Sequence, residues 1–358
     1  MCLRKAPKSG IINVDETRRK AQYSAERMVP MDDIIYESGL ETERQWSEYL
    51  GLTTLGDLKD QYEKGNIKEI IQICEAMHDK RMVQIAYGIK RSGRRLVLLA
   101  GPSSSGKTTS AKKLCIQLMA EGLKPIYIGI DDYYKERDEI PPGPDGLQDF
   151  ESINAIDTEL FNSQIDDILH GKEADVPNFN FVTGKKEFGH RIIQAKEGQP
   201  LIIEGILALK PELTLHLPEE EKFRIYTCPL STLKQNDGSR VKRGDIRKIR
   251  RLIRDHAKRD WNLTQTFEMW PKVRAGENEN IFPYSGIADE IFNSSQPYEL
   301  AVLKKHAMPL LTAEVRGSKF YDEAQRLIRL LDQVPSLEDD SLIEGDSIIR
   351  EFIGGGEL

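Results

Sequence analysis

Five short apolar runs mark the middle of the chain, and segments with helical periodicity separate most of them. Runs of this length with few polar positions are typical of strands buried on both faces of a parallel sheet. Strands that alternate with helices predict a doubly wound α/β sheet, in which ligands bind at the carboxyl ends of the strands. The predicted strands are Leu96–Ala100, Ile126–Ile130, Leu201–Ile203, Phe223–Cys228 and Ala288–Phe292.

Helical patterns flank this set of strands. A helix is predicted from Asn66, with Glu69 completing a capping box, to about Lys90, where Ser92 and Gly93 end it. Its apolar face consists of Ile67, Ile70, Ile71, Cys74 and Met77. A second amphipathic stripe predicts another helix; its apolar residues are Phe320, Ala324, Leu327, Ile328 and Leu331. We therefore expect a helical N-terminal extension over 1–94, opening with a loosely packed lead-in over 1–45, an α/β domain over 95–335 and a C-terminal tail over 336–358.

Composition limits which partners and which cell compartment the sequence favours. The 51 basic and 58 acidic side chains give a net charge of −7, so the surface offers no general attraction to nucleic acid or to an anionic membrane. No apolar stretch is long enough to span a bilayer and no secretion signal is evident, which favours a cytoplasmic protein. The cysteines are Cys2, Cys74, Cys115 and Cys228, and their wide spacing argues against zinc or a disulfide framework. A homo-oligomer remains open.

The first predicted strand leads into the strongest chemical motif of the chain. Leu96–Leu114 reads LVLLAGPSSSGKTTSAKKL, which contains the G-x-x-x-x-G-K-[ST] pattern of a P-loop between a strand and a helix. Backbone N–H groups of such a loop cradle phosphates, the Lys107 ammonium reaches the β/γ oxygens and the Thr108 hydroxyl can ligate Mg²⁺. The predicted ATP-binding residues are Gly101, Pro102, Ser103, Ser104, Ser105, Gly106, Lys107, Thr108 and Thr109.

Carboxylates follow two further strands, at the edge where ligands are expected. Asp131 and Asp132 follow the second strand, where a carboxylate could act as base toward an acceptor hydroxyl; the alternative is a turn or helix cap. Glu204 ends the third strand, where a P-loop enzyme keeps a Mg²⁺-directed carboxylate; the alternative is a solvated loop glutamate.

The only strongly basic stretch is RVKRGDIRKIRRLIRDHAKR, from Arg240 to Arg259. At helical spacing, one face carries Ile246, Ile249, Ile253 and Ala257, and the opposite face carries Arg247, Arg251, Arg254 and Lys258. A charged helix face is usually just solvated, and an RNA-binding strip is another alternative. Beside a P-loop in an acidic protein, we favour a mobile lid over about 237–265 whose arginines close on the triphosphate.

Together, GPSSSGKTT, the DDYY element, LIIEGILAL and DIRKIRRLIRD resemble the uridine kinase and phosphoribulokinase family over roughly 96–295. The resemblance implies a P-loop kinase with an arginine-rich helical lid that uses ATP and Mg²⁺. It places the catalytic base on Asp131 and the magnesium-associated carboxylate on Glu204, beside Thr108. The remaining catalytic residues it implies are Lys107, Arg250, Arg251 and Arg254.

The resemblance also implies where the acceptor binds. A family segment that holds ribose hydroxyls matches Asp149, Phe150 and, more loosely, Glu151. The segment with which uridine kinases read the base matches residues 177–186, with Phe179 as an aromatic platform but Gly184 where the family has a histidine. The acceptor contacts implied are Asp132, Tyr134, Glu151 and Phe179.

Two functions are compatible with these patterns. We favour an ATP-dependent kinase that phosphorylates a hydroxyl of a nucleoside, or of a sugar or polyol. The alternative is a nucleotide-binding regulatory module linked to translation or RNA, because the chain also resembles the kinase part of longer bacterial uridine kinase-like proteins with a threonyl-tRNA-synthetase-like region. Those proteins have an ending similar to Ile349–Gly355.

Overall fold

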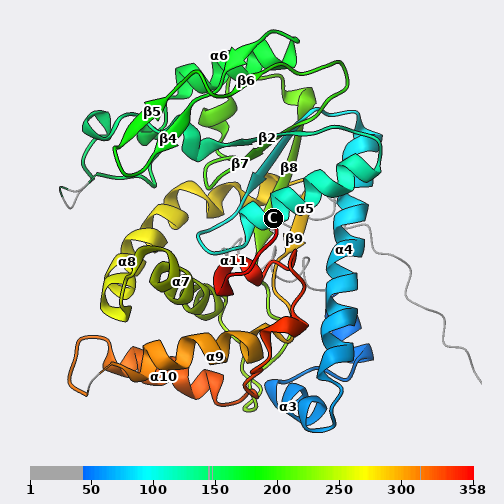
Figure 1. Cartoon of the computed structure of the whole chain (residues 1–358), viewed down its shortest axis with the longest axis vertical. Coiled ribbons are helices and arrows are strands. Elements are labelled where there is room, and N and C mark those ends of the chain that lie inside the picture. The colour runs from blue at the N-terminus through cyan, green and yellow to red at the C-terminus, as the bar shows by residue number, and fades with distance from the viewer. Residues whose placement is uncertain (1–42, 144–145, 147, 315) are drawn as a thin grey trace, which may run out of the picture.

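A computed structural model of the chain describes residues 43–143, 146, 148–314 and 316–358 (Figure 1). At its centre is a five-stranded sheet of order β2-β7-β1-β8-β9, in which every neighbouring pair is parallel. The strands are β1 (Leu96–Ala100), β2 (Ile126–Gly129), β7 (Leu201–Glu204), β8 (Lys222–Cys228) and β9 (Glu290–Asn293). Each lies within two residues of a predicted run, so the predicted doubly wound parallel sheet is confirmed.

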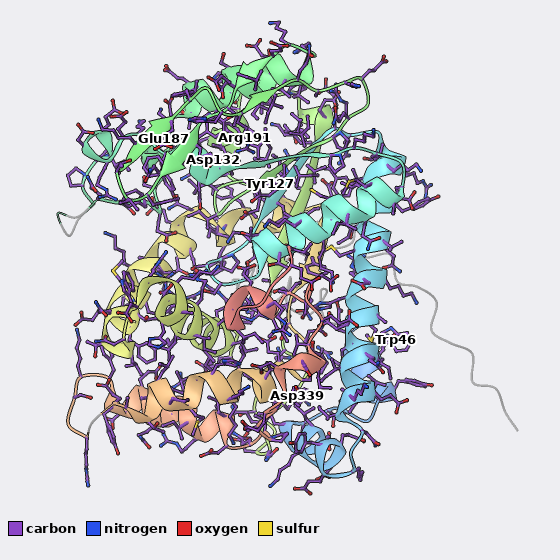
Figure 2. The ribbon with its side chains drawn as sticks, in the orientation of Figure 1. Trp46, Tyr127, Asp132, Glu187, Arg191 and Asp339 are labelled. Atoms are coloured by element: carbon purple, nitrogen blue, oxygen red, sulfur yellow. The ribbon has the colours of Figure 1, made fainter. Side chains whose placement is uncertain are left out.

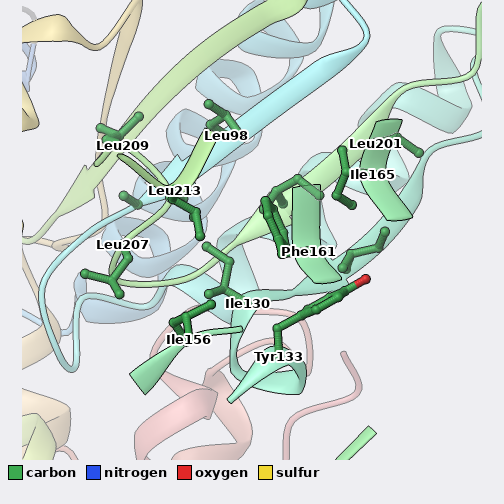
Figure 3. Close-up of a cluster of buried hydrophobic side chains, with 14 of the residues drawn as sticks. Leu98, Ile130, Tyr133, Ile156, Phe161, Ile165, Leu201, Leu207, Leu209 and Leu213 are labelled. Carbon is green, nitrogen blue, oxygen red and sulfur yellow. The ribbon is translucent and has the colours of Figure 1, made fainter. Parts of the chain in front are cut away.

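Helices cover both faces of this sheet, as the side chains of β1 show. Leu98 belongs to the same buried cluster as Phe161 of α6, which Figure 3 shows in close-up. Val97 and Leu99 point the other way, into a cluster with Leu114 of α5 and residues of α4. The three helices are α4 (Ile67–Ser92), α5 (Lys107–Ala120) and α6 (Thr158–Leu169). Burial on both faces explains why the strands are continuous apolar runs.

A third cluster of buried side chains lies away from the sheet. It joins the N-terminal helices to later ones, with Leu58, Leu252, Leu303 and Leu327 each closed to solvent. The helices involved are α3 (Leu55–Glu63), α7 (Arg243–Arg259), α8 (Leu263–Asn280), α9 (Glu299–Thr312) and α10 (Tyr321–Leu331). Among the described residues, no helix is both long and apolar enough to cross a bilayer.

The N-terminal extension is helical where the structure describes it, over 43–49, α3 and α4. The predicted lead-in over 1–45 lies almost entirely outside the described residues. α4 begins after Asn66 and ends at Gly93, whose left-handed backbone (φ 69°) caps it. The capping box was wrong, because the Asn66 backbone is already helical and its side-chain amide donates instead to Gln61.

Two small antiparallel ribbons follow α6, and the sequence did not predict them. Strands of two or three residues are too short to show a hydrophobic period. They are β3 (Ala174–Asp175) with β6 (Ile192–Ile193), and β4 (Asn178–Asn180) with β5 (Lys185–Glu187). In Figure 1 both lie near α6, on the part of the molecule that carries β2 and β7.

The segment 336–358, expected to be a tail, instead packs into the molecule. Ile343, Ile348 and Phe352 are each no more than 2% exposed. A short helix, α11 (Arg350–Ile353), lies beside α7 and near the start of α5 (Figure 1). The prediction missed this packing because isolated apolar residues in a glycine-rich segment show no period.

Candidate active site

The loop between β1 and α5 has the compact shape of a P-loop. A Cβ on Gly101 would come within 2.0 Å of the carbonyl oxygen of Thr227, so only glycine fits there. Gly106 has a left-handed backbone (φ 80°), which lets the chain turn into the helix. The Lys107 ammonium donates to the carbonyl oxygen of Pro102 at 3.3 Å. The N–H groups of the first turn of α5, which have no partner within the helix, therefore lie at a loop suited to receive an anion.

Glu204 and Thr108 meet beside this loop. The parallel pairing of β1 with β7 sets Glu204 opposite Leu99, one strand from the P-loop. The Thr108 hydroxyl donates to Oε2 of Glu204 at 3.2 Å, and the Tyr127 hydroxyl donates to the same oxygen at 2.9 Å. Burial raises the pKa of Glu204 to about 7; Lys107 counteracts this rise and Asp131 adds to it.

This pair suits Mg²⁺, which is commonly held by one or two protein oxygens together with substrate phosphates. No group of three or more potential metal-ligating side chains occurs in the described part of the chain.

Asp131 and Asp132 follow β2 but turn to different partners. The Asp131 side chain reaches solvent, yet surrounding protein atoms desolvate it and raise its pKa; Lys107 opposes this and Asp132 adds to it. Asp132 is paired with Arg191 at 2.7 Å, and Arg191 also donates to the carbonyl oxygen of Tyr127 at 2.7 Å. Figure 2 shows Asp132, Arg191 and Tyr127 close together. Of the two carboxylates, Asp131 is the more exposed, whereas Asp132 is 21% exposed and already has Arg191 as its partner.

Glu151 is a third carboxylate in this region. Burial raises its pKa to about 7; Glu277 adds to the rise, while Arg251 and Lys107 oppose it. Lys107 therefore acts electrostatically on Asp131, Glu151 and Glu204 alike. The structure brings these four predicted residues to one place.

Tyr134 and Phe179 lie in an aromatic cluster. The Tyr134 ring meets that of Phe179 edge-on, with centroids 5.6 Å apart, and both side chains are buried. The Tyr134 hydroxyl donates to the carbonyl oxygen of Phe150 at 3.0 Å, so its donor is already used. Phe181, next to Phe179 in the cluster, is 55% exposed and is the ring that solvent reaches.

Arg250 does not lie where the lid prediction put it. Its guanidinium is closed to solvent and binds both carboxylate oxygens of Glu299, at 2.7 and 2.8 Å. It also donates to the carbonyl oxygen of Ser294 at 2.8 Å and approaches that of Ser104 at 3.5 Å. With these bonds Arg250 supports the P-loop from the protein interior, so we correct its predicted contact with the transferred phosphoryl group to a positioning role.

The predicted polar face of α7 is also largely buried. Arg247 is ion-paired with Glu277 and donates to the carbonyl oxygen of Ser103 at 2.8 Å. Arg251 donates to the Ser103 hydroxyl at 2.8 Å and pairs with Asp255 at 3.1 Å. α7 is thus tied to the P-loop, and these arginines do not form a solvated face.

Arg254 stands at the edge of the same network. Its guanidinium approaches Asp255 at 3.5 Å and its side chain is 19% exposed. Of the three predicted lid arginines, Arg251 contacts the P-loop and Arg254 is the one that solvent reaches most.

Four polar residues of this region were not singled out from the sequence: Tyr127, Arg191, Glu277 and Glu351. The sequence indicates Tyr127 only weakly, because it is a polar side chain within β2, the apolar strand that leads to Asp131. Glu277 accepts from the backbone N–H of Ser103 at 3.1 Å, and Glu351 binds Thr109. No local pattern identifies these two contacts, because each partner comes from a distant helix.

The parallel sheet carries a P-loop after its central strand β1, a carboxylate at the end of the neighbouring strand β7 and two carboxylates after the edge strand β2. These features define a P-loop α/β protein of the kinase type. The sequence model of the phosphoribulokinase / uridine kinase family matches residues 96–300. The chain belongs to this family.

Individual relatives agree with this membership. Uridine kinase from Brevibacillus brevis is 27% identical over 197 residues, which cover 55% of this chain and 83% of the relative. Uridine-cytidine kinase C from Dictyostelium discoideum is 31% identical over 125 residues, covering 35% of this chain but only 26% of that longer protein. Among solved structures, one described as a possible uridine kinase from Bacillus stearothermophilus has a TM-score of 0.36 at 22% identity, covering 43% of this chain and 82% of its own.

Proposed function

We propose that the protein transfers the γ-phosphoryl group of ATP to a hydroxyl of a small acceptor, either a nucleoside or a sugar or polyol. The observation that carries this proposal is the meeting of Lys107, Asp131 and Glu204 at the carboxyl edge of the sheet, beside the P-loop. Phosphoryl transfer depends mainly on positioning and charge neutralisation, and these residues supply a cation, a base and a metal-directed carboxylate. Membership of a kinase family supports the same reaction.

The P-loop residues 101–109, apart from Pro102, hold the phosphates through backbone N–H groups, and Lys107 adds its ammonium. Thr108 and Glu204 would hold Mg²⁺ through their side-chain oxygens. The ion, when bound, neutralises charge on the phosphate oxygens. Tyr127 keeps the Glu204 carboxylate aimed at Thr108 through its hydrogen bond.

Asp131 accepts the proton of the acceptor hydroxyl and aligns its oxygen. Glu151 binds further hydroxyls of the acceptor. Asp132 holds the position of its part of the acceptor site through its ion pair with Arg191. Phe179 contributes to the acceptor site as part of the aromatic cluster with Tyr134 and Phe181, in which Phe181 is the ring that solvent reaches.

Arg251 and Arg254 contribute positive charge toward the transferred group. Arg251 already contacts the P-loop through Ser103, and Arg254 lies beside it at the surface. Arg250 supports the loop without touching the substrate.

The sequence left two alternatives to a kinase: a regulatory module, suggested by the resemblance to longer proteins with a synthetase-like region, and an RNA-binding strip on the basic stretch of 240–259. Arg247, Arg250 and Arg251 are buried in contacts with carboxylates and the P-loop, which removes them from such a strip. The kinase reading therefore has the stronger support.

The proposal is tested by a screen for acceptor-dependent ADP release, with Mg²⁺ and ATP, against nucleosides, sugars and polyols. We expect release with at least one acceptor, and none with Lys107→Ala, whose circular dichroism should match that of the wild type because a loop charge is lost and no packing changes. ATP binding without acceptor-dependent release, together with salt-sensitive RNA binding, would instead support the regulatory module.

A further inference from the structure

A carboxylate of the chain itself is hydrogen-bonded to the N-terminus of the P-loop helix. Oε2 of Glu351, in α11, accepts from the backbone N–H of Thr109 at 3.2 Å and from its hydroxyl at 2.9 Å. Thr109 is in the first turn of α5, so its N–H has no partner within the helix. These first-turn N–H groups are the donors with which a P-loop holds phosphate oxygens.

The same carboxylate also acts electrostatically on the metal pair. The negative charge of Glu351 is among the causes that raise the pKa of Glu204. Glu351 bonds Thr109, the residue after Thr108, so its negative charge lies at the same end of α5 as the Thr108–Glu204 pair and opposes the approach of a nucleotide phosphate.

The backbone around Glu351 is anchored independently of this contact. Ile348 covers the P-loop turn so closely that a Cβ on Gly106 would lie 2.5 Å from its Cγ2. The Phe352 ring lies 4.7 Å from the guanidinium of Arg250, and the Ser347 hydroxyl donates to Glu75 at 2.6 Å. A rotation of the Glu351 side chain would thus free the Thr109 donors without detaching the segment.

We propose that Glu351 sets the nucleotide affinity of the P-loop: its carboxylate occupies a phosphate position on Thr109, and ATP or ADP binds by displacing it. This inference rests on the proposed function in so far as it requires the P-loop to bind a nucleotide. A P-loop occupied by Glu351 cannot bind nucleotide. The apparent dissociation constant for ADP therefore equals the intrinsic one divided by the fraction of molecules in which Glu351 has rotated away.

The test compares ADP binding by calorimetry in the full chain and two variants, Glu351→Gln and Glu357→Gln. Glu357 is the matched control, since it lies in the same segment, is exposed, and its backbone N–H bonds to Gly345. We expect Glu351→Gln to bind ADP about tenfold more tightly, the size of effect typical of removing one competing hydrogen-bonded charge. Glu357→Gln should bind as the wild type does.

Unchanged or weaker ADP binding in a folded Glu351→Gln variant overturns this inference while leaving the kinase proposal intact. Absence of ADP binding in the wild type and both variants overturns the nucleotide site itself. Hydrogen exchange of the wild type gives a reading independent of mutation. On ADP addition, the amides at the start of α5 should become more protected, while those of α11 should keep their exchange rate because other contacts anchor that segment. ADP binding without added protection at the start of α5 would overturn the displacement of Glu351 by a phosphate.

Discussion

Arg250 and Glu299 form a two-pronged ion pair that solvent does not reach, with Nε 2.7 Å from Oε1 and the NH2 nitrogen 2.8 Å from Oε2. The pair joins α7 to the first turn of α9. Since Arg250 also bonds the carbonyl oxygen of Ser294 and approaches that of Ser104, it fixes the strand end after β9 and the P-loop relative to each other. A cation predicted to move with a lid is thus part of the rigid support of the site.

Glu299→Gln is expected to destabilise the protein strongly. It removes one charge of a buried pair and leaves the Arg250 guanidinium uncompensated, which typically costs about 3–5 kcal/mol. Urea denaturation followed by circular dichroism measures the change. Lys319→Gln is the control, because Lys319 pairs with Glu268 on the surface, where its loss should leave the midpoint unchanged. Similar midpoints for both variants would contradict the supporting role of the Arg250 pair.

The sheet could be predicted because its strands are buried on both faces. Such strands leave apolar runs that are hard to mistake, and all five were found within two residues. The P-loop could be predicted because its glycines and Thr108 serve a geometry that is encoded locally. Asp131 and Glu204 followed from a rule of topology: the residue after a parallel strand lies at the ligand-binding edge.

The surroundings of the site could not be predicted, because they depend on contacts distant in sequence. From the sequence, Arg247 and Arg250 were expected to belong to a solvated or mobile face of α7. Their partners are Glu277 and Glu299, 30 and 49 residues further on, and no local pattern identifies them. The contact of Glu351 with Thr109 spans 242 residues. Periodicity gives the face of a helix, whereas burial depends on what packs against it.

Asp131→Asn should preserve nucleotide binding and lower the turnover rate by a factor of about 10² to 10⁴, the usual contribution of a positioned base. Asp132→Asn should lower it less, since the Asp132 carboxylate is already ion-paired with Arg191 and is less exposed than that of Asp131. Steady-state kinetics with calorimetric ADP binding separates the two effects. A larger rate loss for Asp132→Asn would assign the base to that residue.

Nucleotide binding in the presence of Mg²⁺ should strengthen as the pH rises from about 6 to about 8. The metal ion requires the ionised carboxylate, and burial raises the pKa of Glu204 to about 7, so the group is partly protonated at neutral pH. Binding should therefore release protons near pH 7, and calorimetry in buffers of different ionisation enthalpy measures this release.

Tyr127→Phe provides a directional check on the same group. The Tyr127 hydrogen bond favours the ionised form of Glu204, so its removal should move the binding profile to higher pH. Glu204→Gln should remove this group's share of the proton release. An unchanged profile in Tyr127→Phe would show that another group, such as Glu151, controls the titration.

The acceptor prediction rests on Gly184, in the turn between β4 and β5. Gly184 has a left-handed backbone (φ 72°), and a Cβ there would lie 2.7 Å from the Cβ of Arg137. Its N–H donates to the carbonyl oxygen of Asn180 at 2.7 Å, and its own carbonyl oxygen accepts from the N–H of Arg137 at 2.9 Å. The turn therefore has no place for the histidine that uridine kinases carry at this position.

Without that side chain, the acceptor site has an aromatic surface but lacks this donor for a base edge. Sites that hydrogen-bond a substrate group reject analogues lacking it by large factors, whereas apolar contacts discriminate weakly. We therefore expect uridine and cytidine not to be strongly preferred, with the acceptor being another nucleoside held by stacking or a non-nucleoside polyol. Values of kcat/KM across a panel of nucleosides, sugars and polyols decide the matter. A value for uridine more than about a hundredfold above every other acceptor would refute the argument from Gly184 and identify a base-reading group elsewhere in the site.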